Sequence, residues 1–169
     1  EFFPVPQAVR EWLRLMNLPY SDFEPGRADP GPLRAAGETF APTICYEDAY
    51  GSEQLGLARQ STLLVNVTND AWFGDSTAPH QHLDISRMRA LESGRAMLRA
   101  TNDGVTALIG HDGALLGTLP QFQPGVLTGE VQPRTGLTPY VRFGNWPVLA
   151  VLWVGLAVIA VSCRRRIRR

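Results

Sequence analysis

Lysine is absent from this 169-residue sequence, and all 16 of its basic residues are arginine. Five of these arginines lie in the last six positions, so the other eleven are outnumbered by 16 acidic residues in the chain. The body of the chain is therefore mildly acidic. It has no basic patch of the kind that binds nucleic acid, and no nucleic-acid partner is expected.

Cysteine is also scarce, and Cys45 and Cys163 lie in such different surroundings that a disulfide framework is not expected. The patterns CxxC and HExxH are missing. His80 and His82 lie two positions apart in a stretch that borders an expected loop, so we expect neither a metal site nor a cofactor. The chain opens on "EFFPVPQ", with no methionine and no signal peptide, and is interpreted as a piece of a longer protein.

One long uncharged run is present, "WPVLAVLWVGLAVIAVSC" at residues 146–163. As a helix it would span roughly 27 Å, close to the thickness of the hydrocarbon core of a bilayer. A buried core helix is the alternative, but the arginine block that follows favours a transmembrane helix with a cytoplasmic C-terminus. The body would then lie on the opposite face, which in a bacterium is the periplasmic one.

The body alternates between strand-like and helix-like segments, which predicts an α/β fold with crossover connections. Asp112-Gly113 is a strong signal for a hairpin within 104–119. We expect helices over 8–18, 47–60 and 82–100, strands over 39–46, 61–69 and 125–133, and loops over 22–38 and 70–81.

Cys45 ends the apolar run "TFAPTI" and precedes the polar, helix-compatible run "YEDAY". At such a strand-to-helix turn, a side chain is held at the carboxyl edge of the sheet. The backbone N–H groups that follow it can stabilise a thiolate or an oxyanion. A nucleophile is one interpretation of Cys45, and a small buried hydrophobic residue is the other.

Residues 43–50, "TICYEDAY", and the block "NDAWFGD…QH…RMRALE…RATN" resemble the apolipoprotein N-acyltransferases of bacterial envelopes. These are membrane members of the nitrilase (carbon–nitrogen hydrolase) superfamily. The resemblance runs from residue 1 to about residue 163. It implies the C-terminal half of a nitrilase-like αββα sandwich over residues 1–138, followed by one transmembrane helix and an arginine-rich tail over 139–169.

The resemblance also implies the chemistry of the site. Cys45 matches the family nucleophile, which takes an acyl chain from a phospholipid as a thioester and passes it to the N-terminal diacylglyceryl-cysteine of an apolipoprotein. Tyr46 and Glu47 match the pair needed for activity, with the N–H of Tyr46 as an oxyanion donor, and Glu1 matches the end of a "PFGE"-type segment. The family's triad glutamate and lysine lie upstream of that segment. This chain is therefore expected to be an inactive C-terminal fragment, or else a dead relative.

The remaining candidates lie around the same edge of the sheet. Asn69, Asp70, Trp72 and Phe73 form either a simple turn or a wall of the acyl or headgroup site. His82 resembles the family's "QH" position, and for it we expect a hydrogen bond at the start of a helix rather than a catalytic role. Helical spacing of Arg87, Arg89, Glu92, Arg95 and Arg99 predicts pairing along one helix, with a buried Glu92–arginine pair as a further possibility.

Two other functions remain open from the sequence. One is a membrane-tethered amidase or nitrilase that uses the same cysteine with water in place of the amine. The other is a non-catalytic membrane-anchored module. The expected location is the bacterial inner membrane with a periplasmic body, and the expected state is a monomer.

Overall fold

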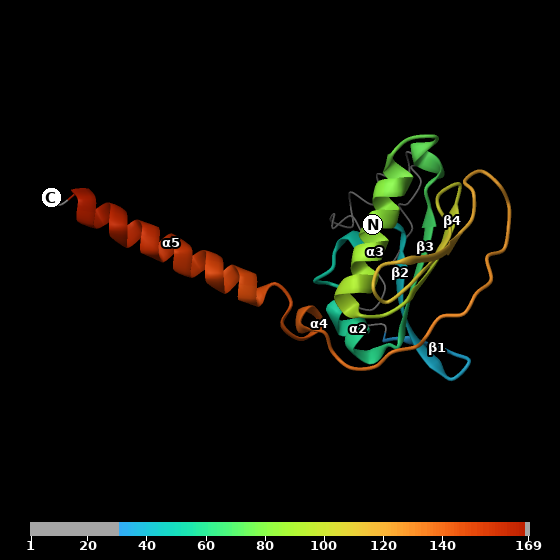
Figure 1. The fold of residues 1–169 in the computed structure, drawn as a ribbon, viewed down its shortest axis with the longest axis horizontal. Coiled ribbons are helices and arrows are strands. Elements are labelled where there is room, and N and C mark those ends of the chain that lie inside the picture. Colours follow the sequence, from blue (N-terminus) through green and yellow to red (C-terminus); the bar gives the residue numbers. More distant parts are fainter. Residues whose placement is uncertain (1–30, 168–169) are drawn as a thin grey trace, which may run out of the picture. The chain divides into compact units, whose positions relative to one another are not determined.

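A six-stranded mixed sheet forms the centre of the computed structural model, which describes residues 31–167 (Figure 1). The strands follow one another across the sheet in chain order: β1 (Leu33–Ala35), β2 (Glu38–Ile44), β3 (Leu63–Asn69), β4 (Met97–Asn102), β5 (Ala107–Ile109) and β6 (Leu115–Thr118). Strands β2, β3 and β4 are parallel, and the other neighbouring pairs are antiparallel. The three parallel strands therefore end at one edge of the sheet, where ligands of α/β proteins commonly bind.

In the described part of the chain, six helical segments accompany the sheet. They are η1 (Cys45–Ala49), α2 (Leu55–Gln60), η2 (Ala71–Phe73), α3 (Ala78–Ser93), α4 (Pro139–Phe143) and α5 (Trp146–Ile167). Helix α3 packs on one face of the sheet (Figure 1), and Leu83 and Ala90, seven positions apart on that helix, belong to the apolar core. The strands contribute Ala41, Leu64, Met97, Ala107 and Ile109 to the same core. The predicted α/β class is confirmed.

The helix expected over 82–100 is wrong at both ends. Helix α3 begins at Ala78, four residues earlier, so it includes His80 and His82, which we expected near a loop. It stops at Ser93 because Gly94 adopts a left-handed conformation, with φ of 65°, and its N–H caps the helix. The next segment is β4, whose alternating burial is typical of a strand. Arg95 and Arg99 are therefore not on the helix.

The other expected elements have mixed outcomes. Strands β2 and β3 and the hairpin of β5 and β6 are confirmed, and Gly113 at the turn has a φ of 77°. The helix expected over 47–60 is broken into η1, a turn and α2. The loop expected over 22–38 contains β1 in the part that the structure describes.

The strand expected over 125–133 is wrong, because residues 119–138 form no helix or strand. This segment includes Pro124, Gly125, Gly129 and Pro133, which are unfavourable in strand interiors. Most of its side chains are exposed, so neither face of the segment has the burial that stabilises a strand. The expected helix at 8–18 and the expected site residue Glu1 lie outside the described residues.

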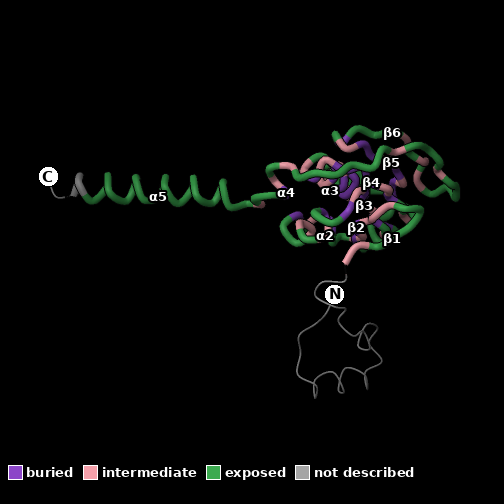
Figure 2. The backbone as a smooth tube through the Cα atoms, turned by 90° about the horizontal axis from the view of Figure 1, so that it is seen from below, coloured by how far each residue is buried: buried purple, intermediate pink, exposed green. Residues whose placement is uncertain are grey.

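Helix α5 is continuous from Trp146 to Ile167, as the apolar run predicts. Every side chain from Trp146 to Arg164 is exposed, whereas the buried residues gather in the sheet and in α3 (Figure 2). Judged by length and composition, Trp146–Arg164 could cross a membrane. The short helix α4, which the sequence did not predict, contacts α2 and α3 and buries Val141.

Candidate active site

Cys45 is the first residue after β2 and the first residue of η1, as predicted from the runs on either side of it. Its φ is +54°, so it is one of four described non-glycine residues with a left-handed backbone. Such a conformation costs of order 1 kcal/mol or more, and it persists only where the surrounding structure holds it. A sharp strand-to-helix turn of this kind is the geometry that nucleophile elbows use to present a side chain above a sheet.

Two side chains hold the backbone of this elbow. The Glu47 carboxylate accepts a hydrogen bond from the N–H of Ile44 at 2.7 Å, and the Asn66 amide donates to the carbonyl of Cys45 at 3.0 Å. Tyr46 is half exposed, and its ring contacts the rings of Tyr50 and His82, with centroids 6.2 Å and 5.7 Å apart. Glu47 therefore fixes the residue before Cys45, and Asn66 fixes Cys45 itself.

The four residues expected to line the site, Asn69, Asp70, Trp72 and Phe73, differ in their exposure to solvent. Asn69 is exposed at the end of β3, and Trp72 and Phe73 on η2 are 76% and 46% exposed. Asp70 is fully buried instead, and its carboxylate faces the protein interior. Asn69, Trp72 and Phe73 thus lie on the surface at the end of β3, the strand next to the Cys45 strand, whereas Asp70 supports the structure below them.

A buried polar cluster lies beneath the elbow. We call it the His82 cluster, and it consists of six residues that are at most 3% exposed: Asp48, Asn66, Asp70, His82, Ser86 and Arg99. They come from η1, β3, the end of β3, α3 and β4. The sequence did not indicate this cluster, because its members are separated by up to 51 positions (from 48 to 99) and only the sheet brings them together.

His82 lies between two carboxylates in this cluster. Its Nε2 is 3.0 Å from Asp48 Oδ1, and its Nδ1 is 3.0 Å from Asp70 Oδ1. The prediction that His82 makes a hydrogen bond at the start of a helix is therefore wrong. His82 lies within α3, and its ring nitrogens contact Asp48 of η1 and Asp70 at the end of β3. The hydroxyl of Ser86, one turn further along α3, donates to Asp48 Oδ2 at 2.5 Å.

Arg99 completes the cluster from β4. Its guanidinium donates to Asp70 Oδ2 at 2.9 Å, to Asn66 Oδ1 at 2.6 Å and to Ser86 Oγ at 2.8 Å. Burial lowers the pKa of Arg99, and the charges of Asp70 and Asp48 oppose that effect. Arg99 was expected to pair along a helix, but on β4 it links α3 to the strand that carries Asn66.

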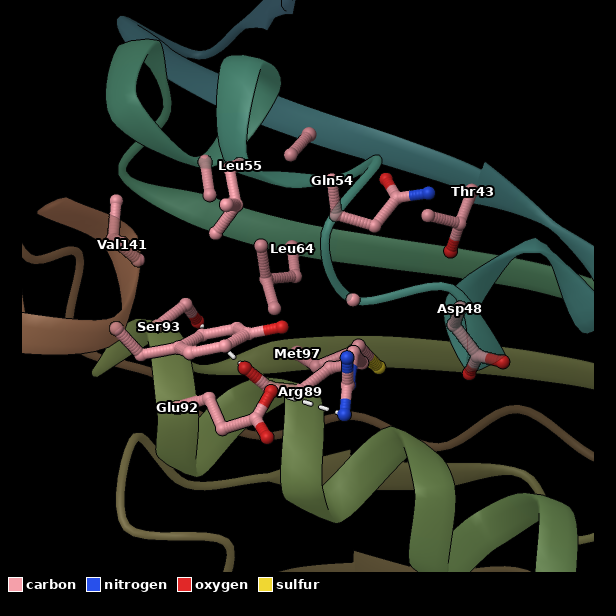
Figure 3. A pocket seen from close by; sticks show the side chains of 14 residues that line it. Thr43, Asp48, Gln54, Leu55, Leu64, Arg89, Glu92, Ser93, Met97 and Val141 are labelled. Carbon is pink, nitrogen blue, oxygen red and sulfur yellow. Dashed lines mark hydrogen bonds and ion pairs between the residues drawn. The ribbon is translucent and has the colours of Figure 1, made fainter. Parts of the chain in front are cut away.

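Separate from the elbow, a mostly apolar pocket lies between the sheet and helices α2, α3 and α4 (Figure 3). Leu64, Met97 and Val141 line its apolar part, and Arg89 and Glu92 of α3 form an ion pair of 3.0 Å at its polar side. The expected arginine–Glu92 pairing is therefore present, and it is largely buried. Within residues 31–167 no group of His, Cys, Asp and Glu side chains is arranged to hold a metal ion.

The sharp strand-to-helix turn at Cys45 on a mixed α/β sheet agrees with the comparison to known families. The family of carbon-nitrogen hydrolases matches residues 19–140, so the chain belongs to that family. A carbon–nitrogen hydrolase structure from Helicobacter pylori covers 59% of this chain and 42% of its own, with a TM-score of 0.51 at 14% identity. That likeness concerns the fold alone, and it confirms the nitrilase-like fold class.

Two curated relatives carry the same name. The apolipoprotein N-acyltransferase of Azotobacter vinelandii is 50% identical over 171 aligned residues that cover all of this chain. The apolipoprotein N-acyltransferase of Pseudomonas paraeruginosa is 46% identical over 99% of the chain. This chain spans 32% of the length of each of them, about a third.

Proposed function

We propose that this chain is part of an apolipoprotein N-acyltransferase and that Cys45 is its nucleophile. The observation that carries this proposal is the positive φ of Cys45 at the carboxyl end of β2, with Glu47 and Asn66 holding the backbone on either side. The names of the relatives, at 46–50% identity, support acyl transfer. The exposed apolar helix α5 supports a membrane location.

The reaction would proceed in two halves. In the first, Cys45 Sγ attacks the ester carbonyl of a phospholipid, the ester C–O bond breaks, and the lysophospholipid leaves with a proton as its alcohol. In the second, the α-amine of a diacylglyceryl-cysteine attacks the thioester, the C–S bond breaks, and an amide and the free thiol form. The N–H of Tyr46 would donate to the oxyanion in both halves.

The other site residues take supporting roles in this proposal. Glu47 positions the elbow through its bond to Ile44, and Asn69, Trp72 and Phe73 form a wall for the lipid. Asp70 belongs below that wall, because its side chain is buried. Glu1 keeps the role that the resemblance implies, beside Cys45. A general base and a lysine would come from residues outside this sequence, which contains no lysine, so this chain alone should not turn over.

Replacing Cys45 tests the nucleophile directly in the full-length protein. Cys45→Ala should abolish transfer of acyl chains to apolipoprotein. Cys45→Ser should be nearly as inactive, because a hydroxyl is far less acidic than a thiol.

Glu47→Ala should slow transfer about 100-fold through misplacement of the elbow. The measurement is the mass of the N-terminal lipopeptide made from labelled phospholipid. Continued transfer by Cys45→Ala would contradict the proposal, and release of free fatty acid without transfer by the unmodified protein would favour a hydrolase.

The orientation of α5 can be tested separately. The arginines that follow the apolar run predict a cytoplasmic C-terminus, with the α/β body on the periplasmic side of the inner membrane. A reporter fused after Arg169 should be active in its cytoplasmic form only. Activity of a periplasmic reporter at the same position would overturn this topology. The catalytic unit is proposed to be a monomer, and its size in detergent checks that.

A further inference from the structure

The environment of His82 determines how many protons its ring carries. Each ring nitrogen is 3.0 Å from a carboxylate oxygen, Nε2 from Asp48 and Nδ1 from Asp70. A neutral imidazole has one N–H and one lone pair, and an ionised carboxylate can only accept. If His82 were neutral, one of the two contacts would bring a lone pair against a carboxylate. With both carboxylates ionised, both contacts are hydrogen bonds only when both ring nitrogens carry a proton.

The charges of the cluster agree with that protonation state. Asp48 from η1 and Asp70 from the end of β3 face His82, and among residues 31–167 Arg99 from β4 is the other charged group packed against them. The ring of Tyr46 lies against the ring of His82, and the hydroxyl of Ser86 lies 3.2 Å from the backbone carbonyl of His82. With a neutral His82, two buried carboxylates would share one cation, which is costly. With an imidazolium, the cluster has two charges of each sign.

The direction in which the pKa of His82 is shifted also favours the doubly protonated ring. Burial is the largest single influence and lowers this pKa, and the charge of Arg99 acts the same way. The hydrogen bonds and charge of Asp48, together with the hydrogen bond of Asp70, outweigh them, so the pKa of His82 is raised above its ordinary value.

The cluster is joined to Cys45 from two sides. Asp48 lies three residues after Cys45 in η1, and His82 and Ser86 tie its carboxylate to α3. Asn66 donates to the carbonyl of Cys45 and accepts from Arg99 at the same time. His82 is therefore connected to the backbone of the elbow through Asp48, and through Asp70, Arg99 and Asn66.

We propose that His82 is a positioning residue, held as a doubly protonated cation between Asp48 and Asp70, which keeps the Cys45 elbow in its acyl-accepting geometry. This inference rests on the proposed role of Cys45 as nucleophile. Loss of the His82 proton at higher pH removes one of its two hydrogen bonds and leaves an unbalanced negative charge beneath the elbow. Acylation of Cys45 then falls as His82 is deprotonated.

Nitrogen NMR of the full-length protein labelled with ¹⁵N-histidine measures the protonation state. The His82 signals are assigned by their loss in His82→Gln or, if that variant does not fold, by their shift in Asp48→Asn. At pH 7, where free histidine with a pKa of about 6.5 is mostly neutral, both ring nitrogens of His82 should carry a proton. A bare ring nitrogen on His82 at pH 7 would overturn the proposal.

The link to Cys45 is tested by the pH dependence of acyl-enzyme formation. Asp48→Asn removes one carboxylate, so His82 should lose its second proton at a lower pH. The rate of Cys45 acylation at pH 7 should then fall about 10-fold, and its alkaline decline should begin earlier. Asp84→Asn is the matched control, because Asp84 is exposed on the same helix and pairs only with Arg87 among the described residues, and it should leave the profile unchanged.

The outcomes separate the two proposals. If Cys45 of the unmodified protein is never acylated, the proposed function fails. If Cys45 is acylated, but Asp48→Asn has the rate and the pH profile of Asp84→Asn, the proposed function stands and the role of His82 is wrong.

Discussion

Cys45 has a left-handed backbone because β2 must end and η1 must begin within a single residue. Strain of this kind persists only where nearby bonds hold it, and Glu47 and Asn66 supply them. The thiol is thereby presented at the edge where β2, β3 and β4 all end. The proposed chemistry depends on this geometry more than on the identity of any one neighbour.

At the residue scale, His82 makes the stability of the fold depend on pH. Because its pKa is raised in the folded protein, its stabilising contribution is complete below about pH 6.5, the value for unfolded histidine, and is lost as pH rises through the folded pKa. His82→Gln should remove this decrease above pH 6.5, whereas His80→Gln, at an exposed position on the same helix, should keep it. The measurement is the free energy of unfolding by denaturant over a pH series, and equal pH slopes in both variants would contradict the prediction.

Sequence reasoning located the strand-to-helix turn at Cys45 but missed the residues that support it, for a physical reason. The turn at Cys45 is encoded by adjacent residues, an apolar run and then a polar one. Arg99 acquires its role from Asp70, 29 positions away, and His82 acquires its role from Asp48, 34 positions away. Nothing local in the sequence distinguishes Arg99 and His82 from exposed helix residues. Asp70 was expected with Trp72 and Phe73 in a simple turn or in a wall of the lipid site, whereas its carboxylate is turned inward.

At the scale of elements, the boundary between α3 and β4 shows where secondary structure cannot be predicted from composition and spacing alone. Residues 95–100, "RAMLRA", are all compatible with a helix, and their arginines have a helical spacing. The helix ends earlier because Gly94 adopts the left-handed cap, and the next segment pairs with β3 as a strand. Burial in the sheet overrides helix propensity there, and a glycine in the middle of the expected helix was the available signal.

The turn between β4 and β5 is expected to be intolerant of side chains. A Cβ on Gly104 would lie 2.3 Å from Asp70 Oδ2 and 2.8 Å from Asp70 Cβ, too close for contact. Gly104→Ala should therefore displace Asp70 and reduce the free energy of unfolding by about 1–3 kcal/mol. Gly56→Ala in α2 meets no atom within 4 Å and should cause no loss. Equal unfolding midpoints of the two variants in denaturant would show that the close packing at Gly104 does not matter.

At the scale of the whole molecule, this chain spans about a third of the length of its curated relatives. It holds the proposed nucleophile, its supporting cluster and an apolar helix, but no lysine. The long apolar helix α5 was predictable because a long uncharged run is a local feature. The base that would activate Cys45 could not be predicted, because the family resemblance assigns it to residues outside this sequence.

The most direct test of the central claim is to detect the acyl group on Cys45. Full-length protein and the isolated chain are incubated with phospholipid carrying a labelled acyl chain, and the label is located by peptide mass spectrometry before and after treatment with hydroxylamine. We predict a hydroxylamine-sensitive acyl group on the Cys45 peptide of the full-length protein, and none on Cys45→Ala or on the isolated chain. A label on another residue, or full acylation of the isolated chain, would contradict the account.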